Sequence, residues 1–363
     1  MAAAGRTPTE QELRAKILAG PPTRGDYTAL AHLLLDSPGR EEEGVAVLEQ
    51  ALDLPLQDIE KADLLSEMAW LLYEYSRPEQ AVAHAERALA LVAGREPTAK
   101  VLLVQGVSYT TLANCQYATD REASKRSSQL AIDALERLIS AYPNSDESAE
   151  GCRYAAGVYV LREEYDKAVR LYERTISLNA SPADRLSALV CLGNALRCQG
   201  RYREADQRLT EARAALEADT RMLPRLLFEL GTVQRLTGRP EEAAQSFECS
   251  LNALGASPFL RADRGFVAQI RWELANLQYD ARQYAEAIAI FRAALPDLLE
   301  TYPELYWHAV VSLGHCFLAT HQYARARDCY EEVVVSAQAP SDEKAVARDG
   351  LAALPSLPPP TVH

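Results

Sequence analysis

Apolar residues recur at helical spacing along most of the chain, in segments that are separated by short polar or glycine-containing turns. The stretch from Cys191 to Leu209, "CLGNALRCQGRYREADQRL", shows the pattern well: an apolar helical segment contains the small residue Gly193, Gly200 then interrupts it, and Tyr202 and Ala205 follow. No segment shows the sustained alternation that is typical of strands. We therefore predict an all-α protein.

The same form, a helix with a small residue, a turn, and a second helix with an anchor residue, recurs along the chain. The second-helix anchors are Gly44, Ala81, Ala168, Ala205, Ala243, Ala287 and Ala326. Neighbouring anchors lie 37 to 44 residues apart, except for a wide gap between Ala81 and Ala168. That gap has room for one enlarged pair of helices, Thr98–Gln116 and Arg121–Ala141. The sequence therefore predicts about eight helix pairs.

Small residues in the first helices, such as Gly193, Gly231 and Gly314, are expected to let a partner backbone approach. Large residues four positions after the anchor, such as Phe247 and Tyr330, are expected to fill the space between one pair and the next. A single pair cannot bury both of its faces, so the pairs are predicted to stack.

The ends of the chain differ from the repeats. We predict a leader at 1–24 with a short helix over Thr9–Ala19, stacked helix pairs over 25–340 with the third pair enlarged at about 98–143, and a capping helix at 341–354. The segment 355–363, "PSLPPPTVH", is rich in proline and is predicted to be disordered.

The repeats resemble those of the tetratricopeptide repeat (TPR) family. The segments "LGNALRCQGRYREADQRLTEA" from Leu192 to Ala212 and "LGHCFLATHQYARARDCYEEV" from Leu313 to Val333 carry most of the family pattern, and the resemblance covers roughly Gly25 to Gln338. The first repeat departs from it, with Gly44 in place of the anchor alanine, and so does the enlarged third. The resemblance implies a right-handed α-solenoid whose concave groove binds a partner protein.

By this resemblance, certain positions of each first helix line the groove. The candidate contact residues are Arg153, Asn194, Arg197, Arg225, Phe228, Arg235, Trp272, Asn276, Tyr279, His308 and His315. In this register helix packing does not require Asn194 or Arg197. Guanidinium and amide groups hold carboxylates and peptide backbones, and aromatic rings give rigid contact area, so we expect an acidic or C-terminal peptide segment as partner. The alternative is that these residues form solvated helix faces without a specific ligand.

A subclass of the family that binds the C-terminal carboxylate of chaperones is not matched. Asn194 and Asn276 give a resemblance, but the positions where the subclass needs a lysine, an asparagine, a second lysine and an arginine are Val190, Thr232, Trp272 and Asn276 here. His308 and His315 are seven residues apart, or about 10 Å along a helix, which is too far for one metal ion without other ligands. We predict no metal and no cofactor.

The net charge of −13 and the pI of about 5.1 argue against a nucleic-acid or anionic membrane partner. The seven cysteines form no CxxC pair, and neither a secretory leader nor an apolar run of membrane-spanning length is visible. We therefore expect a cytoplasmic location. No nucleophile, metalloprotease or phosphate-loop motif is present, so we expect no enzymatic activity.

The sequence favours a non-enzymatic scaffold or adaptor that binds a partner peptide or protein segment in the concave groove. The alternative is a regulatory subunit that controls an attached enzyme or assembly through flexing of the solenoid. The sequence leaves the oligomeric state open.

Overall fold

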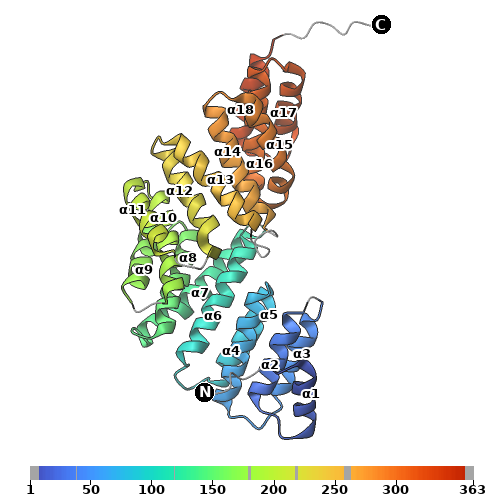
Figure 1. The fold of residues 1–363 in the computed structure, drawn as a ribbon, viewed down its shortest axis with the longest axis vertical. Helices are drawn as coiled ribbons and strands as arrows, with labels where there is room; N and C mark the ends of the chain where they lie inside the picture. The colour runs from blue at the N-terminus through green and yellow to red at the C-terminus, as the bar shows by residue number, and fades with distance from the viewer. Residues whose placement is uncertain are drawn as a thin grey trace, which may run out of the picture. The chain divides into compact units, whose positions relative to one another are not determined.

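The structure is a computed structural model that describes residues 8–37, 39–117, 119–178, 181–216, 220–256 and 263–355. Within these ranges every regular element is a helix, which confirms the all-α prediction (Figure 1). None of these helices combines the length and the apolar character needed to cross a membrane. The predicted proline-rich tail lies outside the described residues from Ser356 onward.

The chain divides into two compact units, unit 1 up to Ala188 and unit 2 from Leu189, and α10 (Pro182–Cys198) contains the boundary. Unit 1 contains α1 (Glu10–Ala19), α2 (Arg24–Leu35), α3 (Glu41–Ala51), α4 (Asp58–Glu74), α5 (Pro78–Leu91), α6 (Ala99–Gln116), α7 (Arg121–Ala141), α8 (Asp146–Leu161) and α9 (Tyr165–Ser177). Unit 2 contains α11 (Tyr202–Ala215), the 3-10 turn η1 (Thr220–Met222), α12 (Leu223–Leu236), α13 (Pro240–Ala256), α14 (Arg264–Asp280), α15 (Tyr284–Thr301), α16 (Pro303–Ala319), α17 (Tyr323–Val335) and α18 (Ser341–Ala353).

Within each unit, consecutive helices pack as hairpins, and first helices also contact the first helix of the next pair, as α4 contacts α6 and α14 contacts α16 (Figure 1). This stacking of helix pairs is the α-solenoid that the repeat pattern predicts. Core clusters extend over several successive pairs, one from α1 to α6 and another from α14 to α18, because each pair leaves one apolar face for its neighbour.

Glycine in a first helix is covered by a large side chain of the second helix in the same pair. A Cβ atom on Gly193 would lie 2.5 Å from Leu209 Cγ, and one on Gly231 would lie 2.7 Å from Phe247 Cε1. Leu209 and Phe247 are both completely buried. Phe247 also belongs to one core cluster with Phe266 and Ile270 of α14, so it lies in the core that its pair shares with the next pair, as predicted.

Tyr330 packs both against the first helix of its own pair, α16, and against the following helix, α18. A Cβ atom on Gly314, in the same pair, would lie 2.6 Å from its ring, and one on Gly350 of α18 would lie 2.5 Å from it. The ring is therefore enclosed between α16 and α18, and Tyr330 is completely buried. Helix α18 covers the last pair through this contact.

Turns between the two helices of a pair share one backbone feature, a residue in the left-handed region. Gly200 and Gly238 have φ of 73° and 76°, and Glu163, Arg282 and His321 occupy the equivalent place with φ of 62°, 61° and 59°. A side chain in this conformation costs about 1–2 kcal/mol, whereas glycine adopts it freely. The turn geometry is thus kept even where the sequence does not supply glycine.

Candidate functional site

The predicted contact residues lie on the first helices of their pairs, α8, α10, α12, α14 and α16. Arg153 belongs to unit 1 and the other ten belong to unit 2. We call the following set the first-helix face of unit 2: Asn194, Arg197, Arg225, Arg235, Trp272, Asn276, Tyr279, His308 and His315.

Phe228 does not belong to this face. It is only 3% exposed, and its ring packs against Phe247 and Phe266 with centroid separations of 5.8 and 5.4 Å. The side chain is part of the core of unit 2, and a partner has no access to it.

Arg153 is held within unit 1. Its Nη2 atom lies 3.4 Å from a carboxylate oxygen of Glu150, and its Nε atom lies 3.2 Å from Asp184. The guanidinium carbon lies 4.2 Å from the ring centroid of Tyr154, and the Tyr154 hydroxyl lies 3.0 Å from the Tyr73 hydroxyl. Three side chains of unit 1 thus contact Arg153 directly, and Tyr73 contacts one of them, Tyr154.

Glu229 on α12 organises the start of the first-helix face. Its carboxylate is completely buried and accepts hydrogen bonds from Asn194 Nδ2, 3.1 Å from each oxygen. Arg197 Nε donates to Oε2 at 3.4 Å, and Arg225 Nη2 lies 2.8 Å from Oε1. A buried carboxylate requires such partners because burial without them costs several kcal/mol.

A second buried acid repeats this arrangement one pair further on. Glu273 on α14 lies 2.9 Å from Arg235 Nε through its Oε2 atom. Burial raises the pKa of Glu273, and the charges of Arg235 and Arg197 partly offset this effect. In both cases an arginine four residues after the small residue of one first helix reaches an acid two residues before the small residue of the next.

These two links correct the sequence interpretation. Helix packing was not expected to require Asn194 or Arg197, whereas both bind the internal carboxylate of Glu229. The missed residues are Glu229 and Glu273, which occupy equivalent positions before Gly231 and Ala275. That shared position is the signal that could have identified them.

One side of α14 carries polar groups that have no partner among the described residues. Trp272, Asn276 and Tyr279 are spaced by four and three residues, so they share one side of the helix, and each is half-buried. The buried Trp272 Nε1 atom has no hydrogen-bond partner among the described residues. Asn276 and the Tyr279 hydroxyl likewise make no hydrogen bond with any residue in the described ranges. We call these three residues the α14 stripe.

The two predicted histidines extend the face onto α16. The ring of His308 lies 5.6 Å from that of Trp272, and its Nδ1 atom lies 3.0 Å from Glu343 of α18. The ring of His315 lies 6.4 Å from that of Tyr279, and burial lowers the pKa of this imidazole. Within the described ranges no group of three or more side chains is arranged to hold a metal ion.

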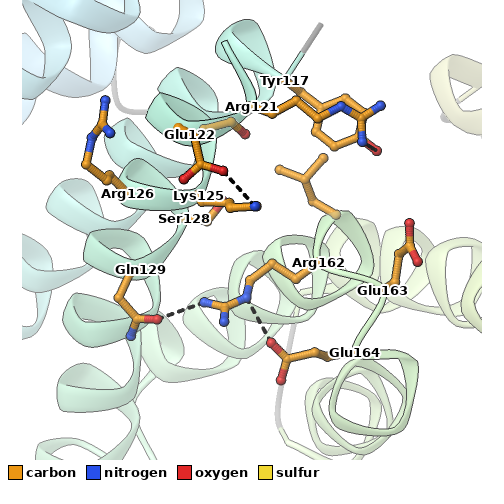
Figure 2. A pocket seen from close by; sticks show the side chains of 12 residues that line it. Tyr117, Arg121, Glu122, Lys125, Arg126, Ser128, Gln129, Arg162, Glu163 and Glu164 are labelled. Atoms are coloured by element: carbon orange, nitrogen blue, oxygen red, sulfur yellow. Dashed lines mark hydrogen bonds and ion pairs between the residues drawn. The ribbon is translucent and has the colours of Figure 1, made fainter.

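A cleft of about 560 Å³ lies in unit 1, where the first turns of α7 face the turn between α8 and α9 (Figure 2). Its charged groups are largely engaged with one another: Lys125 lies 2.8 Å from Glu122, and Arg162 lies 2.8 Å from both Gln129 and Glu164. Because opposite charges alternate around it, the cleft has no preference for a ligand of either sign, and we assign it none.

Comparison with known families and structures follows the repeat pattern. Four family models described as Tetratricopeptide repeat match residues 108–145, 155–186, 184–256 and 273–343, which together are more than half of the chain. No curated protein matches the sequence.

Several solved structures have a similar fold at low sequence identity. The APC/C hetero-tetramer Cut9–Hcn1 matches with a TM-score of 0.53 and 14% identity over 94% of this chain and 66% of that one. A signal transduction ATPase with a tetratricopeptide repeat sensor, from Pyrococcus horikoshii, gives a TM-score of 0.63 and 16% identity over 90% of this chain and 48% of the ATPase. The apo quorum sensor NprR from B. thuringiensis has a TM-score of 0.58 and 12% identity over 89% of this chain and 91% of NprR. This chain therefore spans less than two thirds of the first two proteins.

Proposed function

The chain belongs to the tetratricopeptide repeat family, and from this premise we propose that it is a non-enzymatic scaffold or adaptor. The first-helix face of unit 2 is the wall of its concave groove, and it binds an extended segment of a partner protein. Of the three similar structures, the Cut9–Hcn1 hetero-tetramer is by its name an assembly of different proteins, which supports this role.

The observation that carries the proposal is the α14 stripe. The Asn276 amide offers both a donor and an acceptor, the pair that a peptide group needs, and the Tyr279 hydroxyl offers the same. Trp272 and Tyr279 add rigid aromatic surface, which dominates the energy of many protein interfaces. The Asn276 amide and the Tyr279 hydroxyl make no hydrogen bond within the described residues, so a ligand can pair with them without breaking an internal bond.

Charge favours an acidic segment. Arg197, Arg225 and Arg235 contribute three positive charges, and Glu229 and Glu273 contribute two negative charges, which leaves one positive charge in excess. Arg197 and Arg235 engage the acids through Nε, so their terminal nitrogen atoms remain available to a ligand. Because Glu229 already occupies Asn194, the partner's carboxylate binds beside this cluster and not within it.

A random peptide library displayed on phage tests the proposal. Peptides selected on the wild-type protein are measured by fluorescence anisotropy against Asn276→Ala and against Gln207→Ala, a control at an exposed site on α11. We expect Asn276→Ala to weaken binding about tenfold, the equivalent of one charged-group hydrogen bond, and Gln207→Ala to leave it unchanged. Equal affinities for the two variants would refute the assignment of this face.

The composition of the selected peptides tests the acidic preference separately. Enrichment of aspartate and glutamate, with affinity that falls as salt is added, supports it. If the selected peptides lack acidic residues, the acidic preference is refuted. The location of the binding face is then still tested by Asn276→Ala.

A further inference from the structure

A second surface lies on unit 1 and shares no residue with the first-helix face of unit 2. A groove of about 520 Å³ runs between α5 and α7. Its floor is formed by Gln105 and Tyr109 of α6, and its walls include Leu89 of α5 and Leu130 of α7. The groove is open because the second helices α5 and α7 are separated here by the side of α6.

The lining is mainly apolar. Leu89, Ala93, Pro97, Tyr109 and Leu130 contribute to it, and Leu130 is 46% exposed. An exposed leucine alone is common on protein surfaces, but one that forms the wall of an apolar groove indicates a contact site.

The rim of the groove is basic. Arg95 and Arg137 line it, and neither makes an ion pair with any described residue. The one acid in the lining, Glu86, already accepts a hydrogen bond from the Tyr109 hydroxyl. The lining thus carries two positive charges and one negative charge, which leaves one positive charge in excess.

We propose that this groove docks an acidic amphipathic helix of a partner protein. The walls offer few groups that could satisfy an extended backbone, whereas a helix satisfies its own backbone and presents only side chains. Leu130 and Arg137 are seven residues apart on α7, which corresponds to about 10 Å, so the groove holds about two turns of a bound helix. Apolar residues at helical spacing contact Leu89 and Leu130, and flanking carboxylates pair with Arg95 and Arg137.

This inference goes beyond the proposed function, since it concerns other helices, a different unit and a different kind of ligand. It gives the adaptor a second contact through which two partners are held at once. The two surfaces share no residue, so each is tested without affecting the other.

The test uses two fluorescein-labelled peptides based on alanine, with leucines at i, i+4 and i+7. One carries glutamates on its flanks, and the other carries lysines in their place. We expect the glutamate peptide to bind the full-length protein and the lysine peptide to bind it at least tenfold more weakly. We expect Leu130→Ser to lower the affinity for the glutamate peptide about tenfold or more, because an apolar anchor is lost. We expect Arg137→Glu to lower the affinity for the glutamate peptide and to raise the affinity for the lysine peptide.

The control matches the leucine variant. Leu299→Ser removes a leucine of similar exposure, 47%, from α15 in unit 2, and is expected to leave binding unchanged. Binding of the two peptides with equal affinity, failure of the glutamate peptide to bind, or equal losses in Leu130→Ser and Leu299→Ser would each overturn the proposal.

Discussion

Glu229, Arg197 and Arg225 form a cluster of charges, and the loss in free energy of unfolding depends on which of these charges is removed. Glu229 is completely buried, while the side chains of Arg197 and Arg225 are 24% and 47% exposed. In Glu229→Gln the two arginines lose their acid but can turn to water. In the double variant Arg197→Met and Arg225→Met, the buried carboxylate keeps only the Asn194 amide.

The structure gives a magnitude to this asymmetry. Hydrogen bonds to charged groups contribute about 1.5–3 kcal/mol, but solvent screens the two arginines, so Glu229→Gln is expected to lower the free energy of unfolding by about 2 kcal/mol. An isolated buried charge costs about 3–5 kcal/mol, which is the expected loss in the double arginine variant. A triple variant that removes all three charges is expected to recover most of that loss, because a neutral set of similar volume replaces a buried ion pair well.

The assay follows tryptophan fluorescence during urea unfolding in a Trp70→Phe background. Of the three tryptophans, Trp272 and Trp307 then remain, and both lie in unit 2. Restricting the probe to one unit avoids mixing the transitions of two units. The reasoning fails if the double arginine variant is no less stable than Glu229→Gln, or if the triple variant is the least stable of the set.

Three other predictions concern unit 2. The pKa of Glu273 is raised in the folded state, so between about pH 4.5 and the raised value the native form holds a proton that the unfolded form has lost, and stability falls as pH rises through this window. The difference in unfolding free energy between wild type and Glu273→Gln, measured across pH, should show this fall. A difference that does not change with pH would contradict the prediction. Gly193→Ala should cost about 1–3 kcal/mol through the clash with Leu209, and far less in a Leu209→Ala background, so additive losses in thermal unfolding would exclude the clash. Gly238→Ala should destabilise by about 1 kcal/mol and Arg282→Gly should stabilise by a similar amount; changes of the same sign in denaturant midpoints would refute the turn argument.

The helix pairs could be predicted because the sequence repeats the same physical solution. A small residue in one helix and a large one in the next, such as Gly231 and Phe247, are required wherever two backbones pack closely, so the pattern marks each pair. The division within α10 could not be predicted, because the apolar pattern continues through Ala188 and Leu189 without a break.

The candidate site was predictable in position but not in its connections. The repeat register places Asn194, Arg197 and Trp272 on first helices, where the structure has them. A glutamate on a helix is usually solvated, so nothing local marks Glu229 as buried. Its partner Asn194 is 35 residues away, and the contact depends on the rotation of α12 against α10, which the sequence pattern does not specify.

The arginine-to-acid links also have a consequence for how this protein can change over time. Arg197 requires an acid in the following first helix, and Arg235 requires another, whereas the equivalent position of α16 holds Ser312. The two links have the same form, so deletion or duplication of the α12–α13 pair would still place an arginine beside an acid. An acid-bearing pair placed after α14, which has Tyr279 at the arginine position, would instead leave a buried glutamate without its cation. Although the pairs share one architecture, a pair with a buried acid is compatible only with a predecessor that carries the arginine, and this restricts the order in which the repeats of unit 2 can follow one another.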